Sequence, residues 1–291
     1  MKAFHSFWSA PNRARHGGKV AIPDYELLTM MLSALKWREQ NGEIAMVTDS
    51  AGAEYFRRAG LERLWSAGID TRLDRVDPSL DPVRFWAAGK LWALRRERAK
   101  CVMLDADMIV WEPLGERLGA AVVAAHREAL HPAVYPDPRA AFSLAEGYAF
   151  PEAWDFTLPA ANTAFLYLPD EGFKTRYVDA ALAFMRALRN NVEPVVSMCF
   201  AEQRILPMCA KAEGVALDTL LQEGALDEQR FVTHLWGHKR ALESDPERRV
   251  EYCLRCAARI LSDFPDWEGA LAENDDTKRF WKALRSHQDN V

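Results

Sequence analysis

Short apolar runs alternate with segments of helical periodicity through residues 1–115, and this alternation limits the fold more than any other feature. The strand-like runs are residues 2–8, 44–48 and 101–104. The helical segments are residues 24–42, 53–65 and 82–100. Such alternation is typical of a largely parallel sheet with helices on its faces. We therefore predict an α/β fold for this part of the chain.

The rest of the chain predicts further strands and helices around one irregular stretch. Residues 125–160 are rich in proline but keep their aromatic residues, so we expect a long ordered loop or insertion there. We also expect a loop at residues 9–18, a strand after Asn162, helices at 177–191 and 200–214, and a strand within 230–240. Two or three helices follow Asp245. We divide the chain into a domain at residues 1–240 and a helical C-terminal extension at 241–291, packed on that domain.

The composition excludes several classes of protein. The 37 basic and 42 acidic residues give a net charge of −5, which disfavours a nucleic acid or an anionic membrane as partner. Five scattered cysteines do not resemble a disulfide framework, and the pair Cys253 and Cys256 lies in a predicted helix, where packing is the simpler role. The N-terminus lacks the apolar core of a signal peptide, and no run of about 18 apolar residues occurs. We expect a cytoplasmic protein without a transmembrane segment.

Polar side chains gather where the predicted strands end. Ser6, Thr48 and Asp49 follow two of the strands, and the pair Asp105 and Asp107 follows the apolar run "CVML". In open α/β sheets, ligands bind at the carboxyl ends of the strands. Burying two carboxylates is costly, so the pair either faces water in a turn or has a cation between its members. Oxygen ligands of this kind suit Mg²⁺ or Mn²⁺ shared with a phosphate.

A second polar cluster closes the apolar stretch near residue 232. His234 is followed by Gly237 and then by Lys239 and Arg240. A neutral imidazole is a good ligand for manganese-like ions, a glycine permits close approach of the backbone, and the two cations could meet a diphosphate. A single histidine after a strand is more often structural, but together with an Asp-x-Asp pair it favours a metal site.

Four sequence blocks, in this order, resemble the glycogenin-like, family 8 nucleotide-sugar glycosyltransferases. They are "GKLWALRRERAKCVMLDADMIVWEPL", "ANTAFLYLP", "AEQRIL" and "HLWGHKR". The opening "FHSFWSAPN", with "VTDSAG" and "RFWAAGKLWAL", also resembles uncharacterised bacterial proteins of this glycosyltransferase superfamily. The resemblance covers roughly residues 1–240. It implies a GT-A-like (nucleotide-diphospho-sugar transferase) fold with a mixed central sheet flanked by helices. It also implies metal-dependent transfer of a hexose, with retention, from a nucleotide-sugar, most simply a UDP-sugar.

The resemblance assigns roles to individual residues. Asp105 and Asp107 match the Asp-x-Asp that holds Mn²⁺ (or Mg²⁺) and the sugar-nucleotide, and His234 matches the third protein ligand of the metal. Lys90 matches the helix lysine that contacts the donor. The other expected donor contacts are Ser6, Thr48, Asp49, Lys239 and Arg240. The expected catalytic residues, near the transferred sugar, are Asn162, Glu202 and Gln203.

The chain departs from the family pattern at several positions. Thr163 and Ala164 follow Asn162 where the family often has a small pair, and Glu202 replaces a commoner aspartate. The usual Lys-Pro-Trp is missing after the glycine turn. Lys239 stands one residue early, and Arg240 occupies the expected place of the cation.

Two other functions remain open from the sequence. A haloacid-dehalogenase-like, Mg²⁺-dependent phosphatase also uses Asp-x-Asp after an apolar strand, but has a small hydroxyl residue where Met108 and Ile109 stand. A non-catalytic nucleotide-sugar-binding or interaction protein on the same fold is the other alternative. Glu202 could equally be a helix-start carboxylate, Asn162 a turn amide and Lys90 a surface lysine. The acceptor, whether saccharide, lipid or protein, cannot be read from the sequence.

Overall fold

The computed structural model describes residues 1–222 and 230–288, and a mixed α/β sheet forms its centre. Within these residues a seven-stranded sheet has the order β3-β2-β1-β4-β7-β6-β8. Its strands are β1 (Lys2–Phe7), β2 (Ile44–Thr48), β3 (Ile69–Asp70), β4 (Cys101–Leu104), β6 (Val122–Glu128), β7 (Ala160–Leu168) and β8 (Leu217–Thr219). Strands β1 to β4 are parallel, whereas β7 runs antiparallel to both β4 and β6. The predicted α/β fold with a mixed sheet is confirmed.

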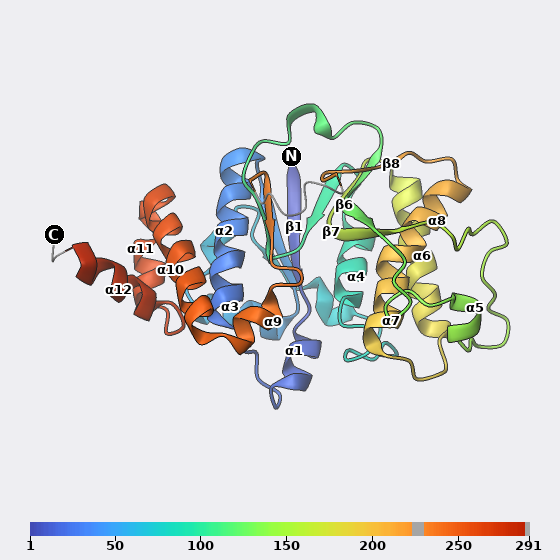
Figure 1. Ribbon diagram of the computed structural model, residues 1–291, viewed down its shortest axis with the longest axis horizontal. Coiled ribbons are helices and arrows are strands. Elements are labelled where there is room, and N and C mark those ends of the chain that lie inside the picture. The colour runs from blue at the N-terminus through green and yellow to red at the C-terminus, as the bar shows by residue number, and fades with distance from the viewer. Residues whose placement is uncertain (223–229, 289–291) are drawn as a thin grey trace.

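Alternating side chains of the sheet divide the hydrophobic core between its two faces. Ala3 and Val102 point into one core cluster, while their neighbours Phe4 and Met103 point into the other, as the two-residue period of a strand requires. Helices α2 (Asp24–Gln40) and α10 (Pro246–Asp263) contribute to the first cluster. Helices α4 (Ala88–Arg96), α6 (Glu171–Ala187) and α8 (Ile205–Ala212) contribute to the second. Figure 1 shows these two groups of helices on opposite sides of β1.

Side chains at the helix ends explain where several helices begin. Asp49 accepts a hydrogen bond from the backbone N–H of Gly52 and begins α3 (Ser50–Arg58), and Asp170 and Asp245 cap α6 and α10 in the same way. Gly42 follows α2 with φ +110°, where a side chain would meet the backbone of Met1 at 2.8 Å. The remaining α-helices of the described residues are α1 (Ser9–Arg15), α5 (Pro138–Ala141), α7 (Pro194–Cys199), α9 (Lys239–Ser244), α11 (Glu268–Glu273) and α12 (Lys278–Gln288).

The structure corrects three local predictions. Residues 9–18 are not all loop, because the buried carboxylate of Asp49 accepts hydrogen bonds from the N–H and the hydroxyl of Ser9 and so stabilises the start of α1. The segment 125–160 begins inside strand β6, whose alanines gave no strand signal, and only its remainder is largely irregular. Strand β7 begins at Ala160, so Asn162 lies within the strand and not before it.

A small second sheet lies beside the end of β4. Strand β5 (Met108–Val110) pairs antiparallel with β9 (Val232–His234), and the register places Met108 opposite His234. The chain between β4 and β5 is the short turn that carries Asp105 and Asp107, closed by a 3.0 Å hydrogen bond from the N–H of Met108 to the carbonyl of Asp105. This pairing brings two distant parts of the sequence to one end of the main sheet.

Ion pairs join the C-terminal helices to α2. The buried carboxylate of Asp24 accepts a hydrogen bond of 2.7 Å from Nε of Arg249 and a second one from Arg279. The ammonium of Lys36, also buried, lies 2.5 Å from Asp263 at the end of α10. Cys253 and Cys256 are buried on α10 in the same core, in the packing role predicted for them. No helix in residues 1–222 or 230–288 has the length and apolar character needed to cross a membrane.

We expect Asp24→Ala to lower the free energy of unfolding by about 2 kcal/mol, because two arginines lose a buried partner but stay partly hydrated. Denaturant unfolding measures this change. Asp275→Ala is the control, since Asp275 pairs with Lys278 on the surface and should matter by less than about 0.5 kcal/mol. Equal stability of the two variants would show that Asp24 does not hold the C-terminal helices.

Candidate functional site

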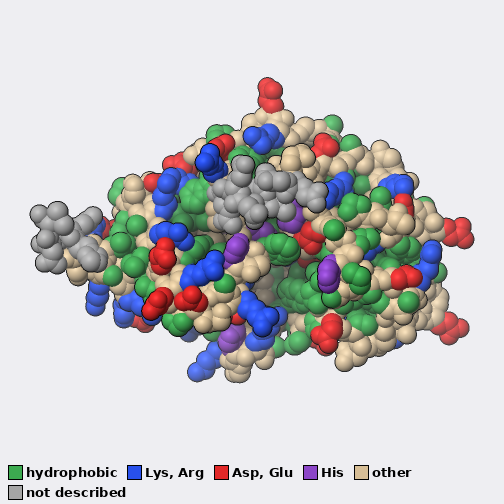
Figure 2. Space-filling view, in the orientation of Figure 1, with side chains coloured by type: hydrophobic (Ala, Val, Ile, Leu, Met, Phe, Trp, Pro, Cys, Tyr) green, Lys and Arg blue, Asp and Glu red, His purple; other side chains and the backbone are tan. Residues whose placement is uncertain are grey.

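A cavity of about 630 Å³ opens where β1 and β4 end, and most of the predicted site residues line it. Its size is that of a typical small-molecule site. Figure 2 shows the hollow, with hydrophobic side chains in its wall and Lys and Arg side chains nearby. The predicted residues that line it are Ser6, Lys90, Asp105, Asp107, Asn162, Glu202, Gln203, His234, Lys239 and Arg240.

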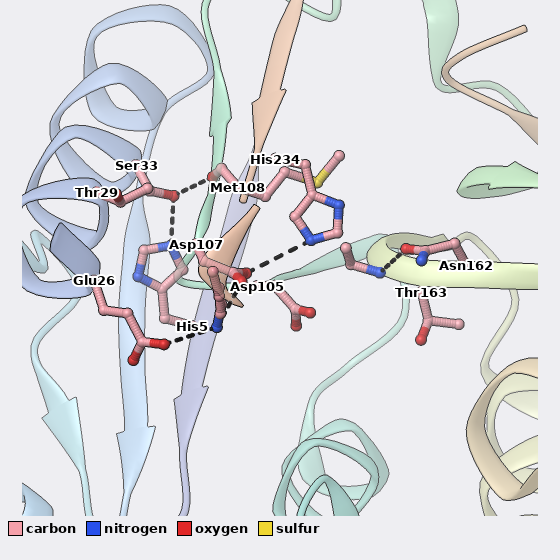
Figure 3. Close-up of polar contacts among 12 residues, drawn as sticks. His5, Glu26, Thr29, Ser33, Asp105, Asp107, Met108, Asn162, Thr163 and His234 are labelled. Carbon is pink, nitrogen blue, oxygen red and sulfur yellow. Dashed lines mark hydrogen bonds and ion pairs between the residues drawn. The ribbon is translucent and has the colours of Figure 1, made fainter. Parts of the chain in front are cut away.

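Asp105, Asp107 and His234 converge at this cavity, as the sequence predicted. One potential ligand atom from each residue lies within 4.8 Å of the other two. His234 Nε2 is 3.7 Å from Asp107 Oδ1, because the pairing of β5 with β9 sets the two residues side by side (Figure 3). Among the described residues, this is the one group of three His, Cys, Asp or Glu side chains so arranged.

The chemistry of the three groups fits a divalent cation. Two carboxylates and an imidazole are ligands that Mn²⁺ accepts, and Mg²⁺ accepts the carboxylates. Burial lowers the pKa of His234 to about 4, although Asp107 opposes this shift. The ring is therefore neutral near pH 7 and has a lone pair to offer a metal.

Two lysines offset the charge of the half-buried carboxylates. Lys90 Nζ lies 2.7 Å from Asp105 Oδ1 and 2.5 Å from Glu202 Oε1, and Lys239 Nζ lies 2.9 Å from Asp107 Oδ2. Burial raises the pKa of Asp105 and Lys90 opposes it, whereas Asp107 and Glu202 raise it further. Burial acts the same way on Asp107, but Lys239 and His234 outweigh it and keep the pKa of Asp107 low. Lys90 thus contacts one predicted metal ligand and one predicted catalytic carboxylate.

Two departures from the family pattern contact each other. The buried hydroxyl of Thr163 donates a 2.5 Å hydrogen bond to Oε1 of Glu202. Thr163, beside Asn162 on β7, thus receives a carboxylate that reaches one methylene farther than that of an aspartate. Glu202 and Thr163 therefore form one buried contact beside the cavity.

Glu202 and Gln203 lie on a wide helical turn and not in a regular α-helix. Residues Phe200–Arg204 form a π-helical turn between α7 and α8, and the hydroxyl of Tyr177 donates a 2.7 Å hydrogen bond to the carbonyl of Glu202. Such turns occur often at functional sites because they redirect side chains within a helix. Here both side chains reach the cavity.

Asn162 is held at both ends of its amide. Its Oδ1 accepts a 3.0 Å hydrogen bond from the N–H of Ala164, and its Nδ2 donates one of 2.7 Å to Oε1 of Glu128. The side chain is buried, yet it lines the cavity. Its orientation is therefore fixed before any ligand binds.

The residues at the ends of β1 and β2 divide into two groups. Ser6 lines the cavity, and its buried hydroxyl has no hydrogen-bond partner within residues 1–222 and 230–288. Thr48 and Asp49 are not among the residues that line the cavity. Thr48 donates a 2.6 Å hydrogen bond to the carbonyl of Phe7, and Asp49 caps α3 and holds Ser9. Their contacts belong to the junction of β2 with α1 and α3.

The two cations of the glycine turn differ in their surroundings. Lys239 bridges Asp107 and Glu26, at 2.9 and 3.0 Å. Arg240 is exposed, lines the cavity and forms no ion pair with a carboxylate of the described residues. Gly237, with φ +79°, permits the turn that brings both cations to the cavity. Of these two cations, Arg240 is accordingly the one left for a ligand.

Among the residues at or beside the site that sequence reasoning missed are Glu26, Glu128, Tyr135 and Trp236. Glu26 lies on α2, where the pattern indicated only a helix, and Glu128 and Tyr135 lie in the stretch predicted to be irregular. Trp236 lines the cavity and is 54% exposed. It stands inside "HLWGHKR", and only its unusual exposure distinguishes it from a core residue. Periodicity carried no signal for Glu128 or Tyr135, because their partners are distant in sequence.

A chain of buried hydrogen bonds fixes the backbone beside Asp107. Trp65 Nε1 donates to Nδ1 of His5 at 3.2 Å, which leaves Nε2 of His5 to donate to the hydroxyl of Ser33 at 3.0 Å. Ser33 in turn donates to the carbonyl of Met108 at 2.5 Å (Figure 3). Burial lowers the pKa of His5 to about 3, so the ring stays neutral and the direction of the chain is set.

Comparison with known proteins identifies the family of the chain. The family described as a family of unknown function (DUF6734) matches residues 1–266. The chain belongs to DUF6734. No functionally curated protein matches this DUF6734 chain in sequence.

Solved structures similar to the DUF6734 chain include two glycosyltransferases. Mouse xyloside xylosyltransferase 1, in its apo form, has 15% identity and a TM-score of 0.37, and the match covers 79% of this chain and 91% of that one. Glycosyltransferase GlyE of Streptococcus pneumoniae TIGR4 has 12% identity and a TM-score of 0.39, covering 78% of this chain and 46% of GlyE. The apo form of GlyE has 12% identity and a TM-score of 0.39, and the match covers 80% of this chain and 53% of that one. The DUF6734 chain thus spans about half of GlyE.

We expect the stability of the protein to fall as the pH is lowered from 6.5, because unfolded His5 binds a proton that folded His5, with its pKa near 3, does not. Each such histidine costs up to about 1.4 kcal/mol per pH unit in this range. His5→Gln keeps an acceptor for Trp65 and a donor for Ser33 but does not titrate. Its free energy of unfolding, measured by denaturant against pH, should therefore fall less steeply than that of the wild type. His16→Gln, at an exposed histidine, serves as the control, and an unchanged slope in His5→Gln would contradict the assignment.

Proposed function

We propose that this protein is a metal-dependent glycosyltransferase that moves a hexose from a nucleotide-sugar, with a UDP-sugar as the expected donor, to an acceptor. The acceptor is a saccharide, a lipid or a protein. One observation carries the proposal: the approach of Asp105, Asp107 and His234 to within 4.8 Å of one another in the wall of a cavity large enough for a small molecule. The ordered sequence blocks around these residues lead to the same reaction.

The three groups would hold Mn²⁺ or Mg²⁺, which supplies positive charge to a leaving diphosphate. The protein adds charge of its own from the glycine turn. Arg240 is exposed at the cavity and has no acidic partner among the described residues, so it can bind a phosphate oxygen. Lys239 stands beside it but is already paired with Asp107 and Glu26. We therefore assign the diphosphate contact to Arg240 first.

On the sugar side, we assign roles to Asn162, Glu202 and Gln203. The amide of Asn162 is held in place by its hydrogen bond to Glu128. The carboxylate of Glu202 is held at the cavity wall by Thr163 and Lys90. With retention of configuration, attack comes from the front face or through a short-lived covalent intermediate, and Glu202 or Gln203 would stand beside the anomeric carbon. Ser6, with its unpartnered hydroxyl, completes the donor contacts.

A phosphatase of the haloacid-dehalogenase type fits the site less well. Such an enzyme needs a small hydroxyl residue after its aspartate pair, but Met108 and Ile109 are fully buried in β5 here. Lys90 also lies against Asp105, the residue that would have to act as nucleophile. The absence of that hydroxyl residue is what disfavours the phosphatase.

We expect Mn²⁺ and UDP together to raise the melting temperature of the wild type by several degrees, since a ligand at about a hundred times its Kd adds about 2.7 kcal/mol. Asp107→Asn and His234→Ala should lose this shift, because each removes a metal ligand. Glu26→Gln is the matched control: it also removes a carboxylate beside Lys239, but no predicted ligand, and should keep the shift. Wild-type shifts in Asp107→Asn and His234→Ala would refute the metal site.

We expect a screen of UDP-, GDP- and CDP-sugars with Mn²⁺ to reveal slow donor hydrolysis that EDTA stops, with UDP-sugars preferred. Release of the nucleoside diphosphate measures it. Hydrolysis of p-nitrophenyl phosphate without any response to UDP would establish the phosphatase instead. Binding of a nucleotide-sugar that is never hydrolysed or transferred would establish a non-catalytic binding protein.

A further inference from the structure

A tyrosine behind the cavity wall connects two of the proposed catalytic side chains. The hydroxyl of Tyr135 lies 2.5 Å from Oε1 of Gln203 and 2.5 Å from Oε2 of Glu128. The other oxygen of Glu128 accepts the 2.7 Å hydrogen bond from Asn162. One hydroxyl group thus links the amide of Gln203, through a carboxylate, to the amide of Asn162.

The position of Tyr135 is fixed by its own segment of chain. Its backbone N–H donates a 2.8 Å hydrogen bond to the carbonyl of His131, and its ring faces the guanidinium of Arg204 at 5.9 Å. Arg204 is buried in turn and donates to the carbonyl of Phe156 at 2.7 Å. Tyr135 itself is only 7% exposed and is not among the residues that line the cavity.

Aromatic packing holds the rest of this segment in place. The ring of Phe150 lies 5.6 Å from that of Phe200, in the π-helical turn, and 6.3 Å from that of Phe184 on α6. Phe142 contacts the same two rings, at 4.9 and 5.0 Å. Residues 129–159 are therefore anchored to the turn that carries Glu202 and Gln203, and Tyr135 is the point at which the segment reaches the polar network.

This contact fixes the end of the Gln203 side chain at the cavity wall. A tyrosine hydroxyl has a single proton to donate and an oxygen that can accept, so it can hold one partner with each. Because the hydroxyl of Tyr135 lies between Glu128 and Gln203, it holds the Gln203 amide in one orientation beside the cavity that Gln203 lines. Without the hydroxyl, the side chain could rotate and present either end.

We propose that Tyr135 is a positioning residue that holds the Gln203 amide in one orientation toward the transferred sugar. The inference rests on the proposed glycosyltransferase function and gives residues 129–159 a part in it. Tyr135 acts through Gln203 and does not touch the substrate. Donor binding depends mainly on Asp105, Asp107, His234 and Arg240, so loss of the hydroxyl should affect turnover and not affinity.

Tyr135→Phe tests this proposal, because it keeps the ring and its contact with Arg204 and removes only the hydroxyl. We expect kcat for donor hydrolysis to fall about tenfold, the size of one lost hydrogen bond of this kind, with KM for the donor unchanged. The melting shift with Mn²⁺ and UDP should stay at the wild-type value. Tyr148→Phe is the matched control: Tyr148 belongs to the same segment and packs on Phe150, and its loss should leave kcat unchanged.

A double-mutant cycle separates positioning from a structural role. In a Gln203→Ala background, Tyr135→Phe should cause no further loss of kcat, because the group that it orients is gone. An unchanged kcat in Tyr135→Phe, an equal loss in both backgrounds, or a loss of the Mn²⁺–UDP shift would each overturn the proposal and leave the proposed function standing. A wild type that neither binds nor hydrolyses any nucleotide-sugar would overturn both.

Discussion

The pairing of two carboxylates with cations at the end of β4 is the constraint on which the site depends. Asp105 and Asp107 are removed from much of the solvent, and such charges persist only with opposite charge nearby. Lys90 comes from α4 and Lys239 from α9, which are far apart in the sequence. Their ion pairs with Asp105 and Asp107 therefore hold two distant helices at the same turn. A divalent ion would compete with both ammonium groups for the same oxygens. Its arrival would leave Lys90 with Glu202 as its remaining partner and Lys239 with Glu26.

The strands and helices that the sequence predicted well are those whose signal is local. The apolar runs at β1, β2 and β4 and the apolar segment of α2 are buried along most of their length, so the parallel part of the sheet could be foreseen. Elements stabilised from a distance could not. Helix α1 starts at a carboxylate from the end of β2, and the short strand β5 exists only because β9 pairs with it.

The candidate site also has a part that the sequence indicated and a part that only the structure shows. The resemblance placed Asp105, Asp107 and His234 together, and the structure brings them together through the register of two short strands. It also indicated Asn162, Glu202 and Gln203, but not the network that orients them. Glu128 and Tyr135 meet these side chains across 34 and 68 residues of sequence, which no local pattern encodes. The contact between Thr163 and Glu202, 39 residues apart, was likewise not visible in the sequence.

Helix α2 connects the C-terminal helices with the turn that carries Asp105 and Asp107. Asp24 and Lys36, near its two ends, pair with Arg249 and Asp263 of α10. Between them, Glu26 and Ser33 reach Lys239 and the carbonyl of Met108. A rigid rod that touches both places transmits displacement from one to the other. Removal of α10 to α12 would therefore take away the ion pairs that hold α2. The turn that carries Asp105 and Asp107 would then lose part of its support.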